Sequence, residues 1–161
     1  MAHHGYISIV GARQGLISAG CSTEESMGNR CQSGHRDEIM VLGFSHTRSL
    51  LGNIQRTQHR PILITKHIDK SSPLLAQAME TLEPLNCEIH FYRVSRSGGQ
   101  ELYYSVRLTG VLIVDQRVEM PHSVLQNGQE AQEYLALRYR DIDWRHHISG
   151  TSGYGSWGSN E

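Results

Sequence analysis

A single helix-like segment interrupts a chain whose other apolar segments have the two-residue period of β-strands. Apolar side chains recur in this segment at helical spacing, at Leu74, Leu75, Ala78, Met79 and Leu82. Ser72 and Pro73 form a favourable helix start, because serine caps free backbone N–H groups and the fixed φ of proline suits the first helical position. Pro84 ends the segment. The pattern predicts one α-helix, at about Ser72–Leu82, in a mainly β protein.

The remaining apolar segments are short, rich in β-branched residues and separated by turns. They predict strands at residues 6–10, 38–44, 61–68, 88–94, 102–109, 111–119 and 131–146. The turn Ser97-Gly98-Gly99 predicts a hairpin, and Gly110 predicts a bulge or barrel corner because it breaks the alternation. In the last segment the apolar residues change face near Arg140, which predicts a second bulge. We therefore predict an antiparallel β-barrel, since closure removes exposed sheet edges.

The length and the composition set the expected domain organisation. A chain of 161 residues is enough for one compact domain. We expect a single barrel domain over residues 1–148 and a flexible Gly/Ser-rich tail over residues 149–161. Between Gly11 and Asp37 the polar composition predicts a long loop with a short strand around Leu16 to Ser18.

Charge and cysteine content exclude several function classes. The 15 Lys and Arg nearly balance the 16 Asp and Glu, so no positive field attracts nucleic acid or an anionic membrane. The longest apolar runs, such as 111–114, are far shorter than the ~20 residues of a membrane helix. Three cysteines do not suit a disulfide framework. Residues 1–5 lack the features of a signal peptide, so we expect folding in the cytoplasm and no export by the general route.

Candidate chemistry is sparse. The ten- and four-residue spacings of Cys21, Cys31 and His35 do not match the paired ligands of a zinc site, so we expect no metal and no cofactor. Cys87 directly precedes a predicted strand and is predicted to be a small core residue. A hydrolase that uses Asp69 or the His-rich surface is an alternative, but Asp69 is better explained as a turn residue before the helix. Catalysis has no positive support in the sequence.

Aromatic residues on neighbouring predicted strands leave a second alternative open. Phe91, Tyr92, Tyr103 and Tyr104 could stack on bases, as a small β-barrel that binds an anionic ligand or single-stranded nucleic acid would require. Without surplus positive charge, core and cross-strand aromatic pairs are the preferred interpretation. Binding that weakens with ionic strength would distinguish the two.

Three segments resemble one known family. The segment Ile64 to Leu74, ITKHIDKSSPL, resembles the signature of the hemolysin-coregulated protein (Hcp) family, in which a strand ends in a Thr-Lys-x-Ile-Asp-like run before a Ser-Pro helix start. Glu38 to His46, EIMVLGFSH, resembles the strand before the family's extended loop, and Leu137 to Trp144, LRYRDIDW, resembles its closing strand. The order and spacing of these segments hold across nearly the whole chain.

The resemblance implies a non-enzymatic structural role. It implies a bacterial protein whose homohexameric rings stack into the inner tube of a type VI secretion system, cytoplasmic before expulsion and extracellular afterwards. The implied partners are other copies of the chain, a VgrG-type spike, sheath and baseplate proteins, and small effector proteins in the lumen. Neither membrane insertion nor nucleic-acid binding is expected.

Two candidate assembly sites follow from the residues and the resemblance together. Segment 38–44 is apolar on both faces, which requires a second surface to cover it, so Ile39 and Val41 are candidate subunit-interface residues. The polar loop 46–60 carries Leu50, Leu51 and Ile54, and the matching loop of the family reaches toward the adjacent ring. These three are candidate ring-stacking residues.

Overall fold

The computed structural model describes residues 5–32, 34–50, 52 and 55–158, and the predicted mainly β fold is confirmed. The strands are β1 (Gly5–Gly11), β2 (Gly15–Leu16), β3 (Ile39–Ser45), β4 (Arg48–Ser49), β5 (Gln58–His59), β6 (Ile62–His67), β7 (Leu85–Val94), β8 (Gln100–Glu119), β9 (Gln132–Arg138), β10 (Asp141–His146) and β11 (Thr151–Ser156). The helices are α1 (Glu24–Met27), a 3₁₀ turn (Gly28–Arg30) and α2 (Ser72–Glu80). None of the helices in these described residues is long and apolar enough to cross a membrane.

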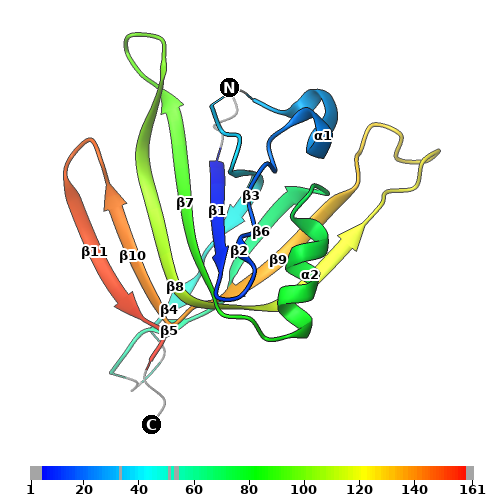
Figure 1. Cartoon of the computed structure of the whole chain (residues 1–161). Coiled ribbons are helices and arrows are strands. Elements are labelled where there is room, and N and C mark those ends of the chain that lie inside the picture. Colours follow the sequence, from blue (N-terminus) through cyan, green and yellow to red (C-terminus); the bar gives the residue numbers. More distant parts are fainter. Residues whose placement is uncertain (1–4, 33, 51, 53–54, 159–161) are drawn as a thin grey trace.

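The main sheet closes on itself. Antiparallel pairings run from β1 through β7, β8, β9, β6 and β3 back to β1. The long strand β8 makes closure possible, because its first half pairs with β7 and β10 and its second half with β9. Gly110 stands at the change of partner with φ +65°, so the predicted corner is confirmed. The pair β10–β11 extends from β8 outside the closed part (Figure 1).

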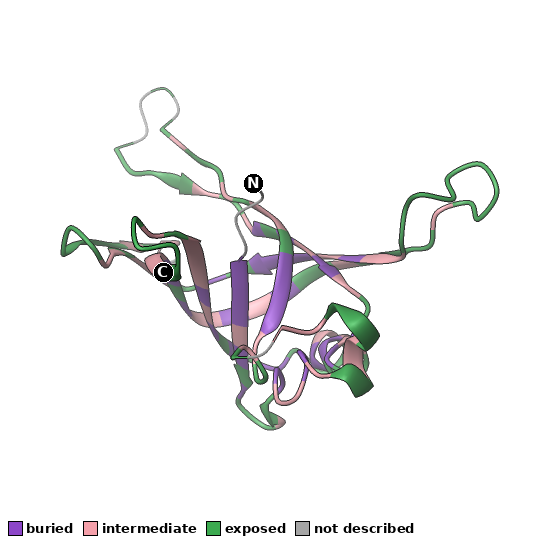
Figure 2. Ribbon diagram, turned by 90° about the horizontal axis from the view of Figure 1, so that it is seen from above, coloured by how far each residue is buried: buried purple, intermediate pink, exposed green. Residues whose placement is uncertain are grey.

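The core fills the inside of the closed sheet. Alternate residues point inward, including Ile7 and Ile9 on β1, Ile62 and Ile64 on β6, and Leu135 and Leu137 on β9. Each of these side chains contributes about 1.5–3 kcal/mol by leaving water. Figure 2 shows the buried residues in the middle of the sheet and the exposed ones on the projecting loops.

Helix α2 is close to its predicted position but begins and ends differently. Ser72 is the first helical residue rather than the cap, and its hydroxyl bonds to Glu133 instead of to the helix backbone. Leu75 and Ala78 are buried against the sheet. Leu82 follows the helix with φ +51° and is 69% exposed, so it does not belong to the buried stripe.

Part of the predicted flexible tail is a strand. Strand β11 pairs with β10 along its whole length, from His146↔Thr151 to Asp141↔Ser156. A Cβ atom at Gly155 would lie 3.0 Å from the Trp144 ring, so the glycine is needed for close packing. The composition of residues 151–156 suggests a flexible end only because the side chain that covers them belongs to another strand.

The loop between Gly11 and Asp37 is more ordered than its composition indicates. It contains β2, near the short strand predicted at Leu16 to Ser18, and also the short α1 and the 3₁₀ turn. Ile17 and Cys21 are buried in the main core. The predicted final strand 131–146 divides at Tyr139 and Arg140 into β9 and β10, which keeps the apolar residues of both strands in the core, as the predicted bulge requires.

Candidate assembly surfaces and the polar clusters behind them

The outward face of β3 and β6 carries exposed leucines. Leu42 on β3 is 42% exposed and Leu63 on β6 is 53% exposed, although adjacent residues on both strands are buried. A groove of about 480 Å³ crosses this face. Its lining includes Gly43, Phe44, Leu63, Thr65, Tyr134 and Ala136. The described chain therefore leaves an apolar surface on this face.

The two residues of β3 that were predicted to form a subunit interface face the core of the barrel instead. Ile39 and Val41 are buried in the chain's own core, so neither side chain is available to a second subunit. The sequence pattern indicated apolar residues on both faces, but it did not tell which face is covered by the same chain. The interface hypothesis therefore moves to the outward residue of the same strand, Leu42.

The β8–β9 loop, residues 120–131, projects from the barrel and is held in shape by its own hydrogen bonds. The Nδ1 atom of His122 accepts the N–H groups of Val124, at 3.2 Å, and Leu125, at 3.1 Å. Met120, Val124 and Leu125 are 75–80% exposed, among the most exposed apolar residues in the described part of the chain. An ordered loop that presents apolar side chains to water is typical of a contact surface.

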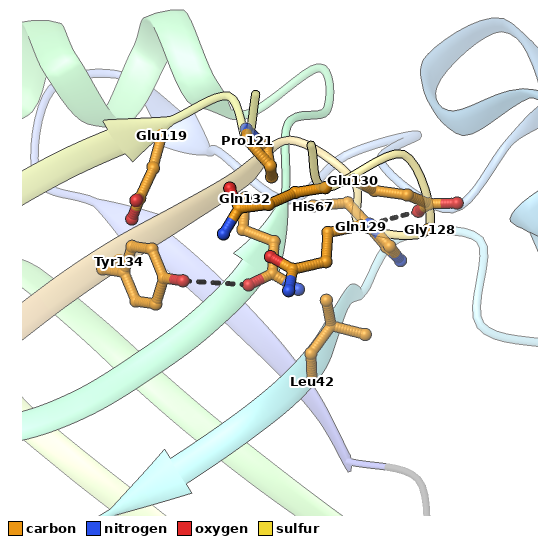
Figure 3. A pocket seen from close by; sticks show the side chains of 10 residues that line it. Leu42, His67, Glu119, Pro121, Gly128, Gln129, Glu130, Gln132 and Tyr134 are labelled. Atoms are coloured by element: carbon orange, nitrogen blue, oxygen red, sulfur yellow. Dashed lines mark hydrogen bonds and ion pairs between the residues drawn. The ribbon is translucent and has the colours of Figure 1, made fainter. Parts of the chain in front are cut away.

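An ion pair joins this loop to the rest of the molecule, and a polar groove lies behind it. Glu130 pairs with Arg30 of the 3₁₀ turn, and its carboxylate lies 3.8 Å from Nδ1 of His67 on β6. The groove behind the loop has a volume of about 520 Å³ (Figure 3). Its lining includes Leu42, His67, Glu119, Gln129, Gln132 and Tyr134. The amide and hydroxyl groups of this lining suit hydrogen bonding to a partner.

The hairpin formed by β4 and β5 is fastened to the barrel by two histidines on one tyrosine. His46 Nε2 lies 2.7 Å from the Tyr139 hydroxyl oxygen, and His59 Nδ1 lies 2.6 Å from the same atom. The Trp144 ring stacks on His46, with ring centroids 6.2 Å apart, and the Trp157 ring lies 6.0 Å from His59. We call His46, Tyr139 and His59 the histidine clamp.

The surroundings of the clamp favour neutral imidazoles. Burial lowers the pKa of His46 to about 4, and the charge of Arg48 contributes to the lower value. Burial and Arg48 also lower the pKa of His59. Burial raises the pKa of Tyr139. At neutral pH the clamp is therefore an uncharged hydrogen-bonded group beside one fixed cation.

Of the three predicted stacking residues, the structure describes one. Leu50 follows β4 and is 69% exposed. Leu51 and Ile54 lie outside the described residues. The stacking assignment of this loop stays a prediction.

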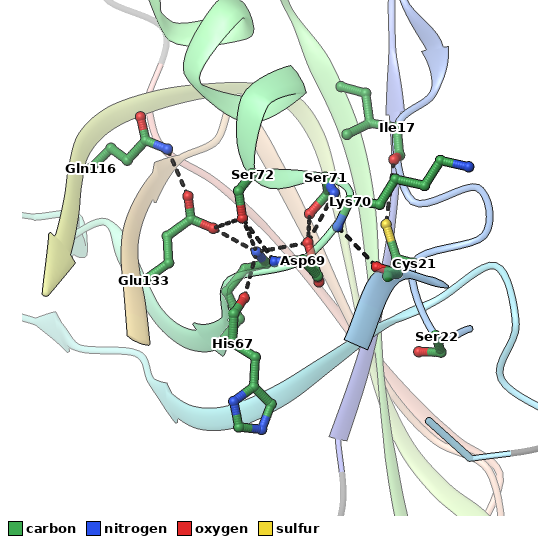
Figure 4. A network of polar contacts seen from close by, with 12 residues as sticks. Ile17, Cys21, Ser22, His67, Asp69, Lys70, Ser71, Ser72, Gln116 and Glu133 are labelled. Carbon is green, nitrogen blue, oxygen red and sulfur yellow. Dashed lines mark hydrogen bonds and ion pairs between the residues drawn. The ribbon is translucent and has the colours of Figure 1, made fainter. Parts of the chain in front are cut away.

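A second polar cluster lies beneath the start of α2 and is fully ionic. Lys66 is completely buried, and its ammonium group donates to Asp69 at 3.0 Å and to Glu133 at 2.5 Å. It also donates to the Ser72 hydroxyl at 3.2 Å, while Gln116 donates to the other oxygen of Glu133 at 2.7 Å (Figure 4). We call Lys66, Asp69 and Glu133 the lysine network. It joins β6, β9 and the helix.

Asp69 also shapes the turn before the helix. Its Oδ1 atom accepts the backbone N–H of Ser71 at 2.9 Å and the Ser71 hydroxyl at 2.5 Å. The prediction that Asp69 is a turn residue is confirmed, and its contacts are structural. The sequence contained a signal for the network, because Lys66 interrupts the inward face of a strand and a buried ammonium requires carboxylate partners.

A third cluster joins the loop before β3 to β7. The Glu38 carboxylate lies 3.2 Å from Nδ1 of His35 and 3.4 Å from Nδ1 of His90. His90 Nε2 lies 3.0 Å from Glu88. The close approach of the His90 imidazole to the Glu38 carboxylate lowers the pKa of Glu38 and raises the pKa of His90. Protonation of His90 therefore stabilises this cluster, whereas protonation of the imidazoles destabilises the histidine clamp.

The remaining sequence candidates are cysteines and possible metal ligands. No group of three His, Cys, Asp or Glu side chains there could hold a metal ion. All three cysteines are free thiols. Burial raises the pKa of Cys21 to about 11 and the pKa of Cys87 to about 12, so both are inert core residues at neutral pH.

The four aromatic residues proposed for base stacking lie on two faces of the sheet. Phe91 and Tyr104 pack against the core with ring centroids 5.6 Å apart. Tyr92 instead packs on Tyr6, and Tyr103 lies under the Arg93 guanidinium at 4.9 Å. They do not form one stacking platform, and core and cross-strand pairing explains them.

The fold and these clusters define the class of protein: a closed antiparallel sheet with one covering helix. Its polar groups fasten loops to the barrel, and its most exposed large apolar residues in the described part of the chain lie on the projecting β8–β9 loop. A family model described as "Type VI secretion system effector, Hcp" matches residues 6–146. The chain belongs to the Hcp family, the tube proteins of type VI secretion systems.

Individual relatives match along nearly the full length. A "Major exported protein" of Pseudomonas aeruginosa is 43% identical over 169 residues, covering 99% of this chain and 98% of the relative. A solved structure described as an Hcp protein is 34% identical with a TM-score of 0.93, covering 99% of this chain and all of the other. Another, described as secreted protein Hcp3 from Pseudomonas aeruginosa, is 43% identical with a TM-score of 0.87, covering 98% of this chain and all of the other.

Proposed function

We propose that this chain is a subunit of the inner tube of a type VI secretion system, that six copies form a ring, and that rings stack into a hollow tube. The observation that carries the proposal is the family match over residues 6–146 of a chain with two exposed apolar projections. The β8–β9 loop and the β4–β5 hairpin project from opposite ends of the barrel (Figure 1). Opposite projections suit contacts with different neighbours.

The apolar surfaces support a head-to-tail contact within the ring. Met120, Val124 and Leu125 form a protruding patch, whereas Leu63 borders the β3–β6 groove and Leu42 borders the groove behind the β8–β9 loop. A contact between two different patches of identical subunits is heterologous, and it produces a closed ring when the rotation closes. We propose that the loop of one copy occupies the outward β3–β6 face of the next.

The same family membership supports the further partners. The relative named "Major exported protein" supports export of this chain. On family membership we also propose a VgrG-type spike, sheath and baseplate proteins as partners and small effectors as cargo in the lumen. The role is structural rather than enzymatic. In support, the lysine network and the histidine clamp use their titratable groups to hold the helix and the hairpin in place.

Ring formation is tested by light scattering and negative-stain electron microscopy of the purified full chain. We expect six-fold rings with an open centre for the unchanged protein. Leu125→Asp places a charge in the proposed contact and should give monomers. Leu82→Asp is the matched control, because Leu82 is also an exposed leucine but lies after α2, and it should still form rings. Rings of unchanged stability with Leu125→Asp would refute the proposed contact.

Ring stacking is tested separately from ring formation. Leu50→Asp should leave single rings intact and prevent tubes, because Leu50 is exposed on the hairpin and not on the β8–β9 loop. Tubes of normal length with Leu50→Asp would show that the hairpin does not mediate stacking. A stable monomer of the unchanged chain at high concentration would instead favour the small binding module, which screens for anionic ligands at low and high salt would examine.

A further inference from the structure

The hydrogen-bond inventory of the histidine clamp limits how many protons it can hold. The Tyr139 hydroxyl has one hydrogen, so it can donate to only one of the two imidazoles, and the other imidazole must donate to it. Because the hydroxyl oxygen could also accept from both imidazoles, its buried hydrogen is satisfied only when one ring nitrogen accepts it, and this is the arrangement expected at neutral pH. If that nitrogen is protonated, both imidazoles present N–H donors to Tyr139, and the buried hydroxyl hydrogen has no acceptor.

The two histidines are therefore not equivalent toward acid. The donating imidazole can take a proton on its distal nitrogen and keep its bond to Tyr139. The accepting imidazole cannot, because the proton would occupy the lone pair that receives the hydroxyl hydrogen. The clamp tolerates one added proton and breaks with the second.

Fixed charges around the clamp oppose the second proton as well. Arg48 on β4 lies over Trp144 with its guanidinium carbon 4.3 Å from the ring centroid, and Arg138 on β9 lies 5.4 Å from the Trp157 ring. The carboxylate of Asp141 on β10 already accepts hydrogen bonds from Arg140 at 2.8 Å and from the Tyr154 hydroxyl at 2.6 Å, so it does not pair with the clamp. Two imidazolium ions would thus stand together beside the Arg48 guanidinium.

We propose that the histidine clamp is an acid-sensitive latch that holds the β4–β5 hairpin on the barrel at neutral pH and releases it when both imidazoles are protonated. The released parts are the described base of the hairpin, β4 and β5, which pair with each other through Arg48↔His59 and Ser49↔Gln58. The barrel itself keeps its closed pairing. The lowered pKa values of His46 and His59 place the release below pH 6.5.

The chain contains its own reporter for this release. Trp144 and Trp157 are its two tryptophans, and each lies against one histidine of the clamp. A titration of tryptophan emission from pH 7.5 to 3.5 on the full chain should give one transition centred well below pH 6.5. Hydrogen exchange of the peptide covering residues 46–60, measured relative to the peptide covering β1, should become roughly tenfold faster over the same range.

Neutral replacements decide whether the histidines cause the transition. The double variant His46→Gln/His59→Gln keeps hydrogen-bonding side chains but cannot be protonated, so it should lose both the emission change and the acid-induced exchange. Tyr139→Phe removes the shared oxygen, so its hairpin should already exchange rapidly at pH 7. His122→Gln removes a histidine of the β8–β9 loop and should leave the transition unchanged.

Three outcomes would overturn the latch. The double variant could show the same transition as the unchanged protein. The transition could be centred at or above pH 6.5. The β1 peptide could exchange as fast as the hairpin peptide, which would indicate global acid unfolding rather than local release.

The consequence for stacking rests on the proposed function and is measured separately. If the hairpin contacts the next ring, tubes should shorten or dissociate at the pH of the emission transition. Tubes that persist through a normal emission transition would refute the hairpin's role in stacking and leave the latch intact.

Discussion

The lysine network and the histidine clamp both join distant segments through polar side chains, but they do so with opposite electrostatics. The lysine network is completely buried and has one cation between two carboxylates, Asp69 at 3.0 Å and Glu133 at 2.5 Å. The clamp has no carboxylate, and it relies on neutral imidazoles at 2.6 and 2.7 Å from one hydroxyl. One holds the helix and the other holds a hairpin.

The difference in charge determines which of the two attachments depends on pH. A buried ammonium paired with carboxylates is stable over the pH range in which neither partner titrates, and removing one partner leaves an uncompensated charge. A neutral imidazole pair is stable only while it stays unprotonated. The helix is therefore fixed to the barrel, whereas the attachment of the hairpin depends on pH.

The largest expected effect is the loss of the lysine. Lys66→Met leaves two carboxylates buried without a cation and should lower the free energy of unfolding by about 3–5 kcal/mol. Urea denaturation followed by circular dichroism measures this change. Lys70→Met is the control, because Lys70 is exposed four residues further on and should change stability by no more than about 0.5 kcal/mol.

A variant without any charge tests the cause. Lys66→Met combined with Asp69→Asn and Glu133→Met removes the unpaired carboxylates and should regain a large part of the loss. If the triple variant is as unstable as Lys66→Met alone, the loss comes from packing and the ionic explanation fails.

The second effect is the pH dependence of the clamp. The pKa of His46 is lowered to about 4, so its contribution to stability is complete above pH 6.5 and is lost as the pH falls from 6.5 toward 4. A tenfold change in a protonation equilibrium corresponds to about 1.4 kcal/mol, and solvent screening reduces the effect at this partly exposed group. The stability difference between the unchanged protein and His46→Gln should therefore fall by on the order of 1–2 kcal/mol over this range. Thermal unfolding at several pH values measures it.

His90 provides a comparison of opposite sign. Glu38 raises the pKa of His90, so its contribution is present below pH 6.5 and is lost as the pH rises through the raised value. The stability difference between the unchanged protein and His90→Gln should therefore increase on acidification. If both stability differences changed with pH in the same direction, the charged groups assigned around at least one of the two histidines would be wrong.

Much of the barrel could be predicted because it depends on local patterns. Short β-branched apolar segments predicted β1 and β3, the alternation of apolar residues predicted β6 and the β7–β8 hairpin, and a single glycine at 110 indicated the corner. These features depend on neighbours in sequence, and each strand needs the same periodicity wherever it pairs. Motif order then connected the chain to the Hcp family.

The errors concern partners far apart in sequence. The strand β11 was missed because its glycines are explained only by the Trp144 ring on β10. Ile39 and Val41 were assigned to an interface because the sequence does not say which face of β3 its own chain covers. The clamp joins residues 80 and 93 positions apart, a pairing that no local pattern indicates.

A smaller effect is expected from the shared oxygen of the clamp. Tyr139→Phe removes one hydroxyl that makes two hydrogen bonds and should lower the free energy of unfolding at pH 7 by about 1–2 kcal/mol. Tyr103→Phe is the control, since Tyr103 lies on the outer face under Arg93. Equal losses in the two variants would show that the two hydrogen bonds of the clamp contribute no more than a hydroxyl group on the outer face.

The smallest effect is expected from the second carboxylate of the lysine network. Glu133→Gln keeps an oxygen that accepts from Lys66 and Ser72, and Asp69 still neutralises the ammonium. The new amide N–H faces Gln116, whose side-chain amide must turn to accept it, and with that adjustment stability should change by less than about 1 kcal/mol. Asp69→Asn should cost more, because Asp69 also accepts two hydrogen bonds from Ser71. If Glu133→Gln is as destabilising as Lys66→Met, both carboxylates must be ionised and required, and the excess negative charge of this site has to be balanced by groups outside the network.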